Sequence, residues 1–65
     1  MKALLLHGAV SHDMITRISY RVSSSVRRFT IIYDSTTISI TFLDVPTSIL
    51  IEDINSIFSS VNIPE

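Results

Sequence analysis

The apolar residues of the first third of the chain change their spacing near residue 11. Residues 3–10, ALLLHGAV, form a short continuous apolar run, which predicts a strand covered on both sides or central in a sheet. Ser11 then offers an N-cap, and Asp13 favours the positive end of a helix dipole. The apolar positions after it recur at spacings of three and four: Met14, Ile15, Ile18 and Val22. This spacing predicts a helix over residues 12–24.

The second half of this predicted helix has a competing interpretation. Ile18, Tyr20 and Val22 also alternate, and the serines, threonine and tyrosine of this stretch are mediocre helix formers. A strand over residues 17–24 is therefore the alternative.

Two later segments alternate with a period of two, which is typical of strands. The segment RFTIIYD places Phe29, Ile31 and Tyr33 on one face, and the segment TTISITFLD does the same with Ile38, Ile40 and Phe42. The polar stretch SSSVRR connects the first helix to these strands, and DSTT predicts a hairpin loop between them. Two strands with one apolar face need a helix layer to cover that face.

The stretch from Pro46 to the C-terminus predicts a second helix, with Asp44 or Thr47 as its cap. Its buried stripe is Leu50, Ile54, Ile57, Phe58 and Val61. Ile49 lies about 140° from Ile54 on a helical projection, and Ile51 lies at the margin of the stripe. The helix thus carries more isoleucine than one stripe can bury, and Ile49 is the candidate for contact with another helix.

This order of elements predicts one α+β domain over residues 1–65: a small antiparallel sheet of about three strands, with two helices packed on one face. A chain of 65 residues buries only roughly 60% of the surface that it exposes when unfolded. It has no cysteine for a disulfide, and its only histidines are His7 and His12. Self-association is the remaining means of stabilisation.

The charges are segregated, although the net charge is only −1. All five basic residues lie in the first 33 positions, where Asp13 is the one acidic residue; the other acidic residues follow residue 33. The four arginines are candidates for phosphate contact: Arg17, Arg21, Arg27 and Arg28. The alternative is that the two halves pair with each other or are simply solvated.

The sequence offers no set of residues for catalysis, cofactor binding or metal binding. Gly8 is the only glycine, which excludes glycine-rich phosphate loops and the Gly-x-Ser-x-Gly elbow. The spacing of His7, His12 and Asp13 matches no standard metal site. The first apolar run is too short for a signal peptide or a membrane span, so we expect a cytoplasmic, non-enzymatic protein without a cofactor.

The C-terminal segment LIEDINSIFSSVNIPE resembles the last helix of the Pcc family, the small dimerisation subunits of the KEOPS complex, which are related to the CTAG tumour antigens. That helix reads leucine, arginine, three variable residues, asparagine-serine and a closing apolar stripe. Leu50, Asn55 and Ser56 match this pattern, whereas Ile51 stands where the family has arginine. Phe58, Val61 and Ile63 continue the stripe.

The resemblance implies a non-catalytic subunit that dimerises and binds, through its helices, the N-terminal helices of the threonylcarbamoyl transferase that modifies adenosine in tRNA. It also implies tRNA contact, for which the four arginines are the candidates. The expected interface residues are Ile49, Ile51, Asn55 and Ser56. Ile51 indicates a divergent paralogue, which pairs with itself or with a standard member. The alternatives are a free-standing nucleic-acid-binding or regulatory module that uses the arginines, and an orphan structural interaction domain.

Overall fold

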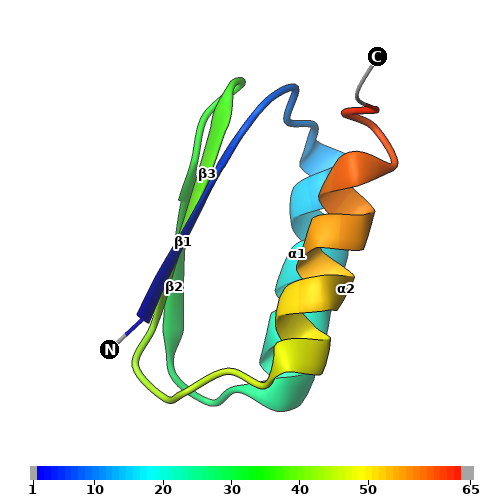
Figure 1. Cartoon of the computed structure of the whole chain (residues 1–65). Helices are drawn as coiled ribbons and strands as arrows, with labels where there is room; N and C mark the ends of the chain where they lie inside the picture. The colour runs from blue at the N-terminus through cyan, green and yellow to red at the C-terminus, as the bar shows by residue number, and fades with distance from the viewer. Residues whose placement is uncertain (1, 64–65) are drawn as a thin grey trace.

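The computed structural model describes residues 2–63 and has the predicted order of elements (Figure 1). The elements are β1 (Lys2–His7), α1 (His12–Ser25), β2 (Phe29–Tyr33), β3 (Thr37–Phe42) and α2 (Ser48–Ser59). The α+β fold is confirmed. Residues 17–24 belong to α1, so the strand alternative is wrong.

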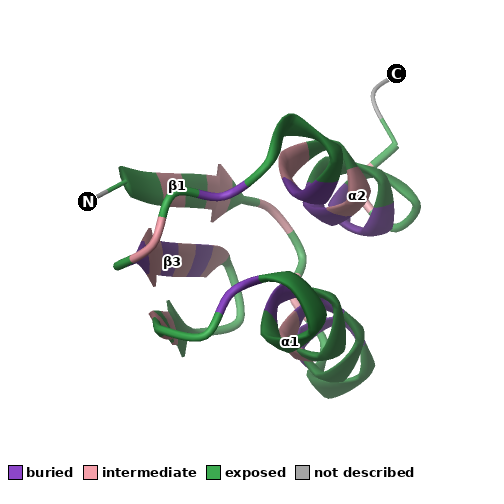
Figure 2. Ribbon diagram, turned by 90° about the horizontal axis from the view of Figure 1, so that it is seen from below, coloured by how far each residue is buried: buried purple, intermediate pink, exposed green. Residues whose placement is uncertain are grey.

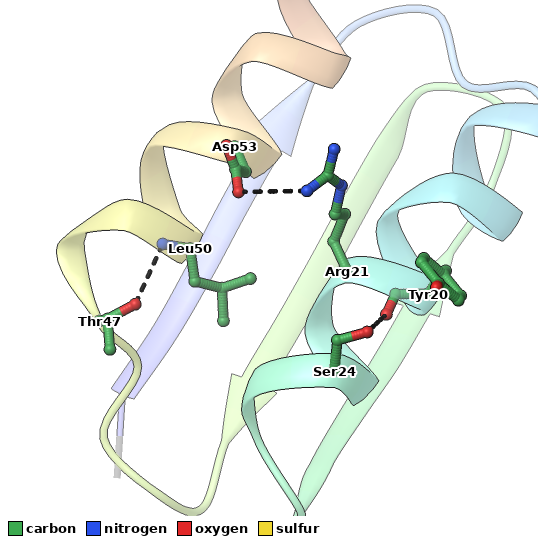
Figure 3. Close-up of polar contacts among 6 residues, drawn as sticks. All are labelled: Tyr20, Arg21, Ser24, Thr47, Leu50 and Asp53. Carbon is green, nitrogen blue, oxygen red and sulfur yellow. Dashed lines mark hydrogen bonds and ion pairs between the residues drawn. The ribbon is translucent and has the colours of Figure 1, made fainter.

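Side-chain caps set the beginning of each helix. The Ser11 hydroxyl accepts a hydrogen bond from the Met14 N–H at 3.1 Å, as the sequence predicts for an N-cap. Of the two candidate caps for α2, Thr47 is the one used, because its hydroxyl accepts from the Leu50 N–H at 3.1 Å (Figure 3). Asp44 does not cap the helix but pairs with Arg28.

The sheet is antiparallel throughout and has the order β1-β3-β2. The expectation of a central or doubly covered first strand is therefore wrong: β3 is central and β1 lies at an edge. The reason is that a short apolar run does not reveal which of its side chains the chain itself covers. Leu5, in the middle of β1, remains 58% exposed on the face without helices.

Both helices lie on one face of the sheet, with α2 on the β1 side and α1 on the β2 side (Figures 1 and 2). The central strand contributes the inner layer of the core through Ile38, Ile40 and Phe42, all fully buried. The helices add the stripes that the spacing predicts: Met14, Ile15, Ile18 and Val22 from α1, and Leu50, Ile54, Ile57 and Phe58 from α2.

Val61 is an exception to the predicted stripe of α2. Its side chain is 52% exposed. The helix ends at Ser59, and the residues after it form a turn, so the 3.6-residue period no longer applies at position 61.

Asn62 joins the end of α2 to the loop after β1. Its side-chain oxygen accepts from the Ala9 N–H at 2.7 Å, and its amide nitrogen donates to the Ala9 carbonyl at 3.1 Å. Gly8 leaves room for this contact, because a Cβ at that position would lie 2.5 Å from the Asn62 side-chain oxygen and 2.8 Å from Cζ of Phe58. The single glycine of the chain thus lies where two segments approach closely.

Candidate partner interface

A groove runs between the two helices on the side that faces away from the sheet. Arg17 and Arg21 line it from α1, Asp53 and Ser56 line it from α2, and Ile57 contributes to both of its hollows. The hollow beside Asp53 and Ser56 has a volume of about 220 Å³. We call this feature the inter-helix groove.

A second hollow adjoins the first on the α1 side and has a volume of about 410 Å³. Thr16 and Tyr20 line it, together with Arg17, Arg21 and Ile57. Tyr20 is 71% exposed and was not among the residues predicted for an interface. Its alternation with Ile18 and Val22 had suggested a strand, whereas in a helix the same position lies on the outer side.

One ion pair crosses the inter-helix groove. Nη1 of Arg21 lies 3.7 Å from Oδ2 of Asp53 (Figure 3). Both side chains are about half exposed, so solvent screens the attraction and it contributes little to stability. Within residues 2–63 no carboxylate lies at ion-pair distance from Arg17, which leaves its positive charge available to a partner.

The other two arginines follow the C-terminal end of α1. Nη2 of Arg28 donates to Oδ1 of Asp44 at 2.7 Å. This hydrogen bond raises the pKa of Arg28 and lowers the pKa of Asp44 from their ordinary values. The structure therefore separates the four predicted arginines into a pair in the groove and a pair beyond the helix, and it pairs Arg28 with Asp44.

The four predicted interface residues fall on two sides of α2. Ser56 lies in the inter-helix groove, and Ile49 shares its side of the helix, about 20° away on a projection at 100° per residue. Ile49 is 69% exposed. Ile51 and Asn55 lie roughly 100–140° from Ser56 on the same projection, on the side remote from α1.

Ile51 and Asn55 therefore lie on the side of α2 nearer β1, away from α1. Ile51 is half buried and packs against the core, and its carbonyl accepts a hydrogen bond from the Asn55 amide at 3.0 Å. Leu4 and Leu6 of β1 are also half buried and face the helices. We call Leu4, Leu6, Ile51 and Asn55, together with the open backbone edge of β1, the β1 flank.

The open face of the sheet carries a further exposed apolar row. Leu5 and Ile32 both pair with Ser39, so the three side chains cross the sheet in one line. Leu5 and Ile32 are exposed. The alternation of Phe29, Ile31 and Tyr33 predicts Ile32 on the opposite face, whereas the sequence does not identify Leu5, because Leu5 lies within a continuous apolar run.

Neither metal binding nor membrane spanning receives support from the described residues. Residues 2–63 contain no cluster of three or more histidine, aspartate or glutamate side chains suited to a metal ion. In the same range, neither helix has the length and apolar character needed to cross a bilayer. The chain matches no family model, no curated protein and no solved structure.

Proposed function

We propose that this protein is a non-catalytic dimerisation and scaffold subunit of a KEOPS-type complex, which supports threonylcarbamoyl modification of tRNA without performing it. The proposal rests first on the resemblance of residues 50–63 to the last helix of the Pcc family. It also rests on the order β-α-β-β-α, in which this chain likewise resembles those subunits.

The observation that carries the proposal is the uncovered outer side of the helix pair. A partner helix laid along the inter-helix groove would cover Ile49 and Tyr20, two large side chains that are mostly exposed in the isolated chain. Contact with a groove between helices is a common way to bury one face of an amphipathic helix. Arg17 favours a partner helix that carries an acidic residue at the groove, since its own charge is unpaired among residues 2–63.

A scaffold agrees better with the charges than a free-standing nucleic-acid-binding module does. Such a module needs several unpaired cations on one surface, because affinity for phosphate grows with each neutralised contact. Here Arg28 is bound to Asp44, and Arg21 lies beside Asp53. On the open face of the sheet Thr30, Ile32 and Ser39 are present, and none of the described strand residues places a phenylalanine, tyrosine or tryptophan ring there for bases to stack on.

Co-expression with the threonylcarbamoyl transferase and a standard dimerisation subunit, followed by size exclusion, tests the proposal. We expect this chain to elute with the transferase. A Ser56→Trp variant fills the inter-helix groove and should abolish co-elution. Ser23→Trp is the matched control, because Ser23 is an exposed serine about 160° from Arg21 around α1.

The outcome also distinguishes the alternatives. If the chain elutes alone while the other two proteins associate, the KEOPS proposal fails and an orphan structural domain is the better description. The nucleic-acid-binding module is favoured if the isolated protein binds RNA and if Arg17→Gln makes the slope of log association constant against log salt concentration shallower by about one unit.

A further inference from the structure

The two walls of the inter-helix groove carry opposite charges. Arg17 and Arg21 lie one turn apart on the α1 wall, and Asp53 lies on the α2 wall. Between Ser48 and Ser59, α2 contains no lysine or arginine, so no cation offsets Asp53 on its own helix. A partner in the groove therefore meets a positive wall on one side and a negative wall on the other.

Two other acidic residues lie near these walls. Glu52 is exposed on the outer side of α2 and adds to the negative charge of that helix. Asp13 is exposed at the beginning of α1, one turn before Arg17, and lines neither hollow. The contrast between the walls is therefore greatest along the part of the groove that Arg17, Arg21 and Asp53 line.

The charged groups on the walls retain free positions for hydrogen bonding. The distance of 3.7 Å between Arg21 and Asp53 exceeds the length of a hydrogen bond, unlike the 2.7 Å contact of Arg28 with Asp44. The side chains of Arg21 and Asp53 remain about half exposed. A guanidinium has several N–H donors and a carboxylate has several acceptor positions, so both can bind a partner without ending their own pair.

The floor and the rims of the groove are apolar. Ile57 lines both hollows, Tyr20 lies on the α1 rim, and Ile49 lies on the α2 side; the latter two are mostly exposed. An amphipathic helix covers such a surface with one apolar stripe, which polar residues flank on both sides. A helix that lies in the groove thus places one flank of its stripe against α1 and the other against α2.

We propose that the inter-helix groove binds an amphipathic helix with acidic residues along one flank of its apolar stripe and basic residues along the other. The acidic flank lies against α1, where it reaches Arg17 and Arg21, and the basic flank lies against α2, where it reaches Asp53. The inference rests on the proposed function, and it states the chemistry of the partner helix that binds there.

The opposite charges of the walls also fix the direction of the partner helix. The helices α1 and α2 lie side by side and antiparallel, with the groove between them (Figure 1). Turning a partner helix end for end, with its apolar stripe still in the groove, exchanges its two flanks. A helix with flanks of opposite sign therefore has one favourable direction and one in which both walls meet like charges.

The exposure of the wall charges limits the size of this preference. Exposed ion pairs contribute little individually, so we expect a helix with mixed flanks to bind about three- to tenfold more tightly than a helix whose flanks have one sign. Salt screens such pairs. The preference should therefore decrease at about 1 M salt, where the Debye length falls to about 3 Å.

Titration of the isotopically labelled chain with three synthetic peptides, followed by NMR, tests the proposal. Each peptide has about two heptads with the same leucine stripe at positions a and d, and a hydrocarbon staple on its outer side keeps it helical. The flanking positions e and g carry glutamate on one side and lysine on the other, glutamate on both sides, or lysine on both sides. The mixed peptide should bind most tightly, and a nitroxide at its N-terminus should broaden amide signals at one end of the groove only.

Variants of the walls provide a second readout. Exchanging the charges by Arg17→Glu, Arg21→Glu and Asp53→Lys should keep the preference for the mixed peptide but reverse its direction, so the broadening moves to the other end of the groove. Arg17→Gln is a milder change that should reduce the preference. Arg27→Glu is the matched control, because Arg27 lies beyond α1 and lines neither hollow, and it should change neither affinity nor direction.

Three results would overturn the proposal: equal affinities for the three peptides, tightest binding of a peptide with flanks of one sign, or no binding at millimolar peptide. Co-elution with the transferase remains the separate test of the proposed function. Co-elution together with equal peptide affinities would refute only the charge pattern. A preference for the mixed peptide without co-elution would refute only the assignment to a KEOPS-type complex.

Discussion

The helix phase of α2 leads to a sharp prediction for two isoleucines five positions apart. Ile54 is fully buried between the sheet and α1, whereas Ile49 is 69% exposed. Truncating Ile54 to alanine removes buried methyl groups and leaves a cavity, which costs about 2–5 kcal/mol. The same truncation at Ile49 should change the free energy of unfolding by less than about 0.5 kcal/mol.

The size of this difference is large for so small a domain. At about 0.05–0.15 kcal/mol per residue, the whole chain is stable by roughly 3–10 kcal/mol, so Ile54→Ala removes about a fifth of the stability or more. Urea unfolding followed by far-UV circular dichroism measures it. With a slope of about 1 kcal/mol per molar urea, the midpoint should fall by at least about 2 M.

A milder variant covers the case in which Ile54→Ala does not fold. Ile54→Val should cost about 0.5–1.5 kcal/mol, a shift that remains measurable in a folded protein. Ile49→Ala should keep the wild-type midpoint and weaken co-elution with the transferase. Equal losses of stability at the two positions would show that the assigned phase of α2 is wrong.

Two further predictions concern the loops. Gly8→Ala should lower the free energy of unfolding by about 1–3 kcal/mol, because the new Cβ displaces the Asn62 side chain. When Asn62 is already alanine, thermal unfolding should show a smaller loss for Gly8→Ala. An equal loss in that background would exclude this mechanism. Asp34 accepts hydrogen bonds from the backbone and hydroxyl groups of Thr36 and Thr37, which lower its pKa, the Thr36 N–H having the largest effect. The ionised Asp34 carboxylate therefore stabilises the fold above its ordinary pKa of 3.8, and this stabilisation is lost as the pH falls below that value. At neutral pH the urea midpoint of Asp34→Asn should be lower than that of the wild type. On acidification the midpoint of Asp34→Asn should change less than that of the wild type.

The elements were predictable because their signals are local. Ser11 and Thr47 are side-chain caps placed next to apolar stripes, and the alternation after Arg28 indicates strands whichever way the sheet is assembled. The covering of one face by two helices follows from the need to bury the apolar sides of those strands. These features depend on residues within about ten positions of one another.

The arrangement around β1 was not predictable, because it depends on contacts between residues that are distant in the sequence. A run such as ALLLH has the same pattern in a central strand and in an edge strand that keeps an exposed leucine. The contact of Asn62 with Ala9 joins residues 53 positions apart, and its one signal in the sequence, the glycine beside Ala9, does not show which segment approaches. The separation of the arginines likewise depends on Asp44, which is distant from Arg28 in the sequence.

The predicted interface residues lie on different sides of α2, and this separation has a functional consequence. Ser56 and Ile49 belong to the side that carries the inter-helix groove, and Ile51 and Asn55 belong to the β1 flank. A partner helix in the groove therefore does not contact Ile51 or Asn55. Ser56→Trp should then abolish co-elution with the transferase, whereas Asn55→Ala on the other side of α2 should leave it unchanged. Loss of co-elution in both variants would show that the partner does not bind along the groove.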